Sequence, residues 1–93
     1  MTMTKKSDVF NGKRTEIKNL LDRTVHPTKV TFHNDGTITV KRSFFYRTEA
    51  GAELMAEKIA KELSIRVIES YDDWKPWPKI SYLVVKFELN SNI

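Results

Sequence analysis

Three adjacent aromatic residues stand between basic residues at positions 41–47 of the chain, in the stretch KRSFFYR. Successive side chains of a β-strand point to opposite faces, so three rings in a row cannot all enter one core. At least one ring is therefore expected on the outer face, beside Lys41 or Arg42. Rings that stack on unpaired bases, next to cations that contact phosphates, are typical of surfaces that bind single-stranded nucleic acid.

Arg42 decides which of these rings turns outward. If the apolar residues before it face the core, alternation carries Arg42, Phe44 and Tyr46 inward as well, and burying a guanidinium is costly. We therefore expect either a β-bulge near Arg42–Ser43 or a strand end at which Arg42 reaches solvent. A bulge would turn Phe45 inward and leave Phe44 and Tyr46 outside.

A second unusual segment, DDWKPWPK at positions 72–79, holds two tryptophans and two prolines. We predict a loop of eight residues between two strands, which is longer than a simple turn needs. Prolines lower the entropy cost of ordering a loop, and tryptophan is strongly enriched in protein-binding hot spots. Trp74 and Trp77 are thus candidate protein-interaction residues, and the alternative is that they cap one end of the core.

Other residue types that often carry chemistry show no spacing that supports a metal site or catalysis. His26, His33 and Asp35 are the candidates for metal binding, but they match no ligand motif. The serines lack a glycine-flanked nucleophile turn, and the adjacent acids at 72 and 73 are interpreted as solvated loop residues. The chain has three widely separated glycines and no cysteine. We therefore expect neither enzymatic activity nor a metal or cofactor.

Length and composition fit one small globular domain with a mild basic excess. The chain has 93 residues and a formal net charge of +4, and seven of its sixteen lysines and arginines fall within residues 1–30. This excess permits an anionic partner without requiring one. The longest apolar run has four residues, at 82–85, and the first ten residues lack the apolar segment of a secretory signal. We expect no membrane segment, and a reducing compartment such as the cytoplasm.

Periodicity predicts two helices and four strands. Apolar residues at helical spacing indicate a helix over 13–23, ended by His26-Pro27, and a second helix up to residue 63 with Thr48 as its cap. Alternation indicates strands at 28–34, 37–46, 65–71 and 80–89. Asp35-Gly36 predicts a hairpin turn in which both residues have positive φ. Residues 1–12 are expected to form a flexible arm and residues 13–90 a single domain.

The order helix, strand, strand, helix, strand, strand predicts an α+β two-layer sandwich. Both helices should cover one face of a four-stranded antiparallel sheet, because an apolar helix stripe cannot bury itself. The link through the second helix should be a right-handed crossover, with the last strand central, between the second and third. This arrangement resembles a circularly permuted ferredoxin-like plait, and it leaves one face of the sheet uncovered.

These observations predict a non-enzymatic binding module whose open sheet face binds single-stranded nucleic acid or RNA. The residues predicted to contact nucleic acid are Lys41, Arg42, Phe44, Tyr46, Arg47, Tyr82 and Lys86. The alternative is a protein-interaction module that acts through the aromatic strand and through Trp74 and Trp77. Such a module would be a homodimer, or a small inhibitor of the kind found among accessory proteins of phages and mobile elements. A third possibility, binding of a small molecule, has no marker in the sequence beyond the fold.

Overall fold

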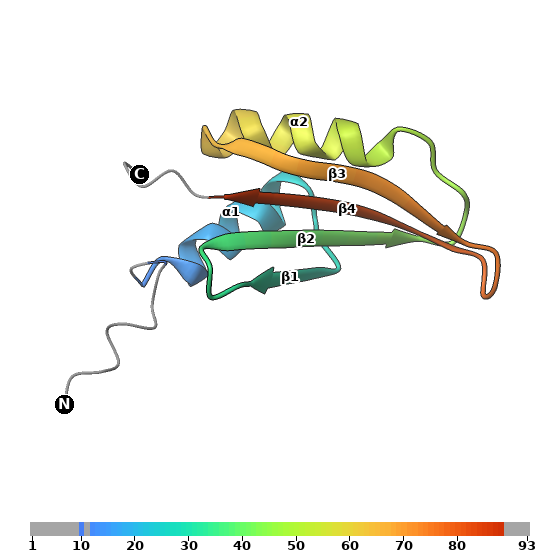
Figure 1. Ribbon diagram of the computed structural model, residues 1–93, viewed down its shortest axis with the longest axis horizontal. Coiled ribbons are helices and arrows are strands. Elements are labelled where there is room, and N and C mark those ends of the chain that lie inside the picture. Colours follow the sequence, from blue (N-terminus) through green and yellow to red (C-terminus); the bar gives the residue numbers. More distant parts are fainter. Residues whose placement is uncertain (1–9, 11, 89–93) are drawn as a thin grey trace.

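The computed structural model describes Phe10 and residues 12–88, which form two helices and four strands in the predicted order (Figure 1). The elements are α1 (Arg14–Thr24), β1 (Lys29–Phe32), β2 (Thr37–Phe44), α2 (Gly51–Leu63), β3 (Arg66–Lys75) and β4 (Ile80–Glu88). The strands form one antiparallel sheet in the order β1-β2-β4-β3, so the last strand lies between the second and third, as predicted. The α+β sandwich is thereby confirmed, and the likeness to a permuted plait stays an interpretation of this topology.

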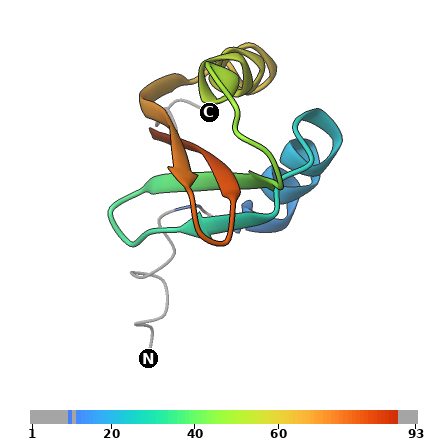
Figure 2. The ribbon, with the colours of Figure 1, turned by 90° about the vertical axis from the view of Figure 1, so that its right-hand side faces the viewer.

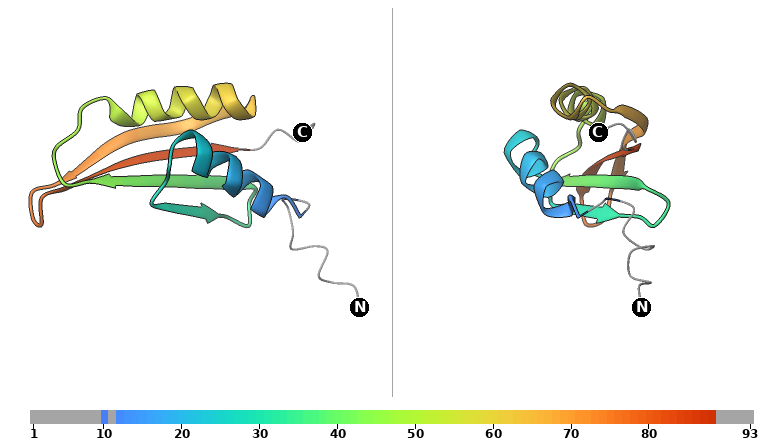
Figure 3. Two further views of the ribbon diagram at one scale, coloured as in Figure 1. Left: turned by 180° about the vertical axis from the view of Figure 1, so that it is seen from behind. Right: turned by 90° about the vertical axis from the view of Figure 1, so that its left-hand side faces the viewer.

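Both helices pack on one face of the sheet, which we call the core face. Ile38 and Val40 of β2 and Val85 and Phe87 of β4 alternate onto this face and are fully buried. The helices meet them with their apolar stripes, and Ile17, Leu21, Ala52, Met55, Ala56 and Ile59 are the buried helix residues. Seen from behind, α1 lies across the sheet and α2 runs along it (Figure 3). The end-on view shows β1 and β2 strongly twisted relative to β3 (Figure 2).

Phe10 belongs to the core, which agrees with the expectation that Val9 and Phe10 of the arm pack against the domain; Val9 lies outside the described residues. Its side chain is 2% exposed, and its ring meets that of Phe32 edge-on with the centroids 5.1 Å apart. The guanidinium of Arg14 lies 5.2 Å from the Phe10 ring and 5.4 Å from the Phe32 ring. The remainder of the predicted arm before residue 12, and residues 89 and 90 of the predicted domain, lie outside the described residues.

The hairpin between β1 and β2 is confirmed, but its turn differs from the predicted one. Of the Asp35-Gly36 pair, only Gly36 has a positive φ, at 91°. The Gly36 amide donates to the His33 carbonyl (3.1 Å) and the His33 amide donates to the Thr37 carbonyl (2.9 Å). The turn is therefore a three-residue loop that ends in a left-handed glycine. The Asp35 carboxylate accepts hydrogen bonds from the hydroxyl and amide of Thr37, which hold the pKa of Asp35 below its ordinary value.

The β-bulge predicted near Arg42–Ser43 is absent, and that prediction is wrong. β2 keeps one register against β4 from Thr37 to Phe44. β2 ends two residues beyond Arg42, and the Arg42 side chain is half-buried, so it reaches solvent only in part. The irregularity of the sheet is in β3, between Val67 and Glu69. β3 is an edge strand with a single neighbour, and sheet edges are where bulges concentrate.

Half of the predicted tryptophan loop is β-strand. β3 extends to Lys75, so residues 72–75 pair with residues 80–83 of β4, and only residues 76–79 form the turn. The two prolines, at 76 and 78, both fall within this turn. Since a proline interrupts the ladder only where it stands, the two strands pair right up to the turn.

α2 is capped by a residue of β3 and not by Thr48, so the predicted cap is wrong. The helix begins at Gly51, and no side chain of its N-cap residue makes a capping hydrogen bond. The carboxylate of Asp72 accepts hydrogen bonds from the amides of Gly51 (3.1 Å) and Ala52 (2.9 Å). The Thr48 hydroxyl donates to the same carboxylate at 2.7 Å. Desolvation raises the pKa of Asp72, but these hydrogen bonds outweigh it and leave the pKa below its ordinary value.

Candidate functional site

The face of the sheet opposite the helices, which we call the open face, carries one lysine without an ion pair among the described residues on each of three neighbouring strands. Lys29 of β1 lies directly opposite Lys41 of β2. Lys86 of β4 lies opposite Thr39 of β2, so it alternates onto the same face as Lys41. We call Lys29, Lys41 and Lys86 the basic strip. No helix covers it, because both helices pack on the core face (Figure 3).

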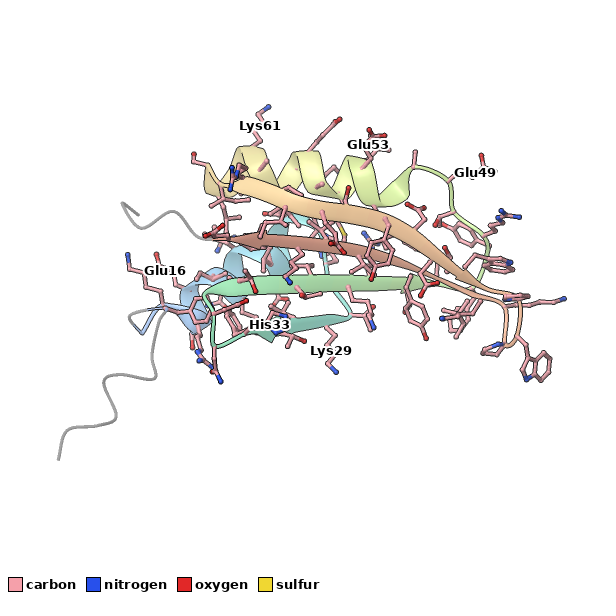
Figure 4. The ribbon with its side chains drawn as sticks, viewed as in Figure 1. Glu16, Lys29, His33, Glu49, Glu53 and Lys61 are labelled. Atoms are coloured by element: carbon pink, nitrogen blue, oxygen red, sulfur yellow. The ribbon has the colours of Figure 1, made fainter. Side chains whose placement is uncertain are left out.

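Within the described part of the chain, no lysine of the basic strip forms an ion pair with a carboxylate. Among the described residues the ion pairs are Lys18–Asp22, Arg66–Glu88 and Lys75–Asp73. Lys29 extends from β1 away from the rest of the sheet (Figure 4). Like charges directly opposite each other destabilise an antiparallel pair of strands. The Lys29–Lys41 pair therefore concentrates positive charge that no ion pair among the described residues offsets.

Two tyrosines border the basic strip on the open face. The Nζ atom of Lys41 lies 5.1 Å from the ring centroid of Tyr82, a cation–π contact. Tyr71 of β3 is 46% exposed and lies opposite Val84 of β4. Tyr71 and Tyr82 occupy diagonal positions on adjacent strands, which places their Cα atoms roughly 7–8 Å apart. Val84, itself 6% exposed, lies between Lys41 and Tyr71 and forms an apolar floor.

The sequence analysis identified Lys41, Tyr82 and Lys86 of this face but missed Lys29 and Tyr71. Strict alternation from Val67 would place Tyr71 on the core face. The irregularity after Val67 reverses this alternation and turns Tyr71 to the open face. Lys29 is brought opposite Lys41 by the register that the three-residue turn sets, and no sequence signal distinguished this turn from a two-residue one.

Arg42 and Phe44 lie on the core face, so the predicted outward position of Phe44 is wrong. Without a bulge, alternation continues from Val40 through both residues. Phe44 packs against the core cluster, with the Arg42 guanidinium 4.8 Å from its ring centroid and the Tyr46 ring 5.3 Å away. Arg42 and Phe44 therefore do not share a surface with Tyr82.

Tyr46 and Arg47 follow the end of β2 and lie off the open face. They belong to the end of the molecule where the β3–β4 turn extends beyond both helices (Figure 1). Phe45, Tyr46 and Trp77 are there 86%, 62% and 87% exposed, and we call these three the aromatic end. Trp74 differs from Trp77, because it is half-buried in β3 opposite the fully buried Ser81. Trp74 therefore alternates onto the core face, whereas Trp77 is exposed in the turn.

The histidines and acids of the described chain are not arranged as a metal site. The Nε2 atom of His33 is 2.7 Å from the hydroxyl of Thr39, and this hydrogen bond occupies the ring at the edge of the open face. No group of three or more histidines and acids among residues 12–88 is placed to hold a metal ion. Neither α1 nor α2 has the length and hydropathy needed to cross a membrane.

The chain matches no protein-family model, and comparisons with curated proteins and with solved structures find no similar protein. Its function is therefore inferred from its own side chains.

Proposed function

We propose that this protein is a non-enzymatic module that binds single-stranded nucleic acid, DNA or RNA, on its open face. Unpaired bases stack on Tyr71 and Tyr82, and the basic strip contacts the phosphates. A single strand is preferred to a duplex because a ring can stack only on a base that is free of its partner. The proposal retains three of the predicted residues, adds Lys29 and Tyr71, and leaves out those that lie off the open face.

The observation that carries the proposal is the opposition of Lys29 and Lys41 on a face that no helix covers. Two like-charged residues occupy directly opposed positions on the two strands, an arrangement that disfavours strand pairing. A bound polyanion would convert this unfavourable pair into a favourable one. Lys41 also touches the Tyr82 ring, so the charge and the stacking surface form one continuous site.

The mixture of charges on the open face indicates moderate affinity. Glu88 and Asp73 are already paired with Arg66 and Lys75, while Glu69 lies opposite Lys86. We therefore expect about three phosphate contacts, one for each lysine of the basic strip. Three contacts to a single strand predict that log Kd rises with log salt concentration with a slope of about 2.

The proposal is tested by titrating the protein into a fluorescently labelled oligonucleotide of mixed sequence at about 50 mM salt, where electrostatic affinity is high. Tyr82→Ala should weaken binding about tenfold, because one stacking platform is lost. Phe45→Ala is the control, since that ring is 86% exposed and follows the end of β2, outside the basic strip and its two tyrosines, and it should leave Kd unchanged. Absence of binding at this salt concentration, or an equal loss in both variants, would contradict the proposal.

A second candidate function is protein binding through the aromatic end. Phe45 and Trp77 are the most exposed large apolar side chains among the described residues. Aromatic residues that protrude in this way are typical of interface hot spots. The partner in this candidate function is a second copy of the chain.

A further inference from the structure

A small cavity lies on the core face, between α2, the end of β2 and the residue that follows α1. Its volume is about 100 Å³, roughly that of three water molecules. The apolar part of its lining comes from Val25, Gly51, Leu54, Met55 and Leu83. The polar part comes from two cations, Arg42 of β2 and Lys58 of α2. The cavity lies on the opposite face of the sheet from Lys41 and Tyr82 and is independent of the proposed nucleic-acid site.

Arg42 is held in this cavity without a counter-charge. Its Nη1 atom donates a hydrogen bond to the carbonyl oxygen of Val25 at 3.1 Å, and its guanidinium lies over the Phe44 ring at 4.8 Å. These two contacts fix the plane of the guanidinium. No carboxylate of the described chain forms an ion pair with it. A half-buried cation on the core face of a sheet is costly unless an anion accompanies it.

Asp72, which lies close to the cavity residue Gly51, does not supply that anion. Asp72 lies behind Gly51, and a Cβ added to Gly51 would come 3.5 Å from an oxygen of Asp72. Its carboxylate is already used by the amides of Gly51 and Ala52 and by the hydroxyl of Thr48. Lys58 likewise has no ion pair among the described residues. Neither cation of the cavity therefore has an ion-pair partner in the described part of the chain.

We propose that this cavity binds a small carboxylate, with the charged group between Arg42 and Lys58 and a short aliphatic body against Leu54, Met55 and Leu83. The planar guanidinium matches a carboxylate in a bidentate geometry, and the ammonium of Lys58 adds a second charged donor. The apolar lining favours a carboxylate with one or two carbon atoms attached over inorganic phosphate, which has no apolar part.

The proposal is tested by following backbone amide resonances while sodium propionate is added to the full chain at constant ionic strength. Propionamide is the neutral molecule of the same shape. We expect saturable shifts at Val25, Gly51 and Leu54 with propionate and none with propionamide. Arg42→Gln should weaken binding about tenfold or more, because a charge-assisted hydrogen bond is lost. Because Arg42 lies on the core face, its replacement can also affect folding. Lys58→Gln is therefore a second variant, at an exposed position, and it should also weaken binding.

Lys61→Gln is the control variant, because Lys61 extends from α2 away from the sheet and the cavity (Figure 4). It should leave propionate binding unchanged. Equal shifts with propionamide, the absence of saturation below about 100 mM propionate, or tighter binding of phosphate than of propionate would each overturn the proposal. An equal effect of Lys58→Gln and Lys61→Gln would also overturn it, because it would show only diffuse attraction to the surface.

Discussion

Asp72 shows how one side chain can join two layers of this protein. It belongs to β3, yet it accepts the first free amides of α2 and the hydroxyl of Thr48. Its neighbour Asp73 points to the open face and pairs with Lys75 at 3.3 Å. The two adjacent acids therefore have different roles, because successive side chains of a strand point to opposite faces. Neither is the solvated loop residue that the sequence analysis predicted.

Removing the Asp72 carboxylate should destabilise the protein. We expect Asp72→Ala to lower the free energy of unfolding by about 1–2 kcal/mol at pH 7, the usual effect of losing a helix cap. Asp73→Ala is the matched control and should cost less than about 0.5 kcal/mol, since it breaks only an exposed ion pair. Urea unfolding followed by circular dichroism measures both. Equal losses in the two variants would show that Asp72 does not cap α2.

The same carboxylate should make stability depend on pH in acid. The pKa of Asp72 is lower in the folded protein than its ordinary value of 3.8, so the folded state favours the charged form. Its contribution is therefore complete above about pH 5 and disappears as the pH falls through the folded-state pKa. The difference in stability between wild type and Asp72→Ala should shrink over this range. A difference that stays constant down to about pH 2 would contradict the assignment.

The antiparallel strands β1 and β2 carry the clearest conflict between folding and binding. Lys29 and Lys41 occupy opposed positions across the hairpin. On the same face, the acids Glu88 and Asp73 are already paired with Arg66 and Lys75. A strand pair selected for stability alone would place an opposite charge at one of these positions. The proposed nucleic-acid site predicts such a conflict, because residues placed to bind phosphates repel one another when no ligand is bound.

Replacing Lys29 by glutamate should stabilise the free protein and weaken its binding. We expect a gain of a few tenths of a kcal/mol in the free energy of unfolding, because a repulsive cross-strand pair becomes an attractive one. Affinity for the oligonucleotide should fall, and the slope of log Kd against log salt should drop by about 0.7 or more. Thermal unfolding and the oligonucleotide titration measure the two effects.

Lys29→Gln provides the control for this change. It removes the repulsion without adding an attraction, so its stability should lie between those of wild type and Lys29→Glu. If both variants are less stable than wild type, the Lys29–Lys41 pair does not oppose folding. If both bind the oligonucleotide as tightly as wild type does, Lys29 does not contact the phosphates.

The folded molecule has three candidate binding surfaces, whereas two were predicted from the sequence. The open face holds the basic strip and two tyrosines, and the core face holds the Arg42 cavity. The aromatic end extends past both helices at the β3–β4 turn (Figure 1). Because different side chains form each surface, substitutions can be chosen that test the function proposed for one surface at a time.

The aromatic end should control any self-association of the protein. If two copies meet there, sedimentation equilibrium should show a dimer whose dissociation constant rises at least tenfold in a Phe45→Ser/Trp77→Ser variant. Both side chains are more than 80% exposed, so the variant should unfold at nearly the same urea concentration as wild type. Tyr71→Ser, on the open face, is the control and should leave the dimer unchanged. A wild-type protein that stays monomeric at every concentration would exclude this second candidate.

The sequence by itself determined the elements, their order and the central position of the last strand. Those features depend on local periodicity, on the residues between elements and on the need of each apolar stripe for cover. Arg42 was also recognised as anomalous from alternation alone. The extension of β3 to Lys75 was not, because two closely spaced prolines look like a loop until their pairing partners are known.

Only the tertiary structure decided which side chains share a surface. One irregularity after Val67 moved Tyr71 to the open face, and the absence of one in β2 kept Phe44 on the core face. A register change of one residue reverses every side chain beyond it, and local sequence does not specify where an edge strand takes up an extra residue. The cap of α2 likewise comes from a residue 20 positions away, which meets the helix only when the sheet is assembled. Contacts between distant segments thus decide the candidate sites, whereas local sequence decides the elements that carry them.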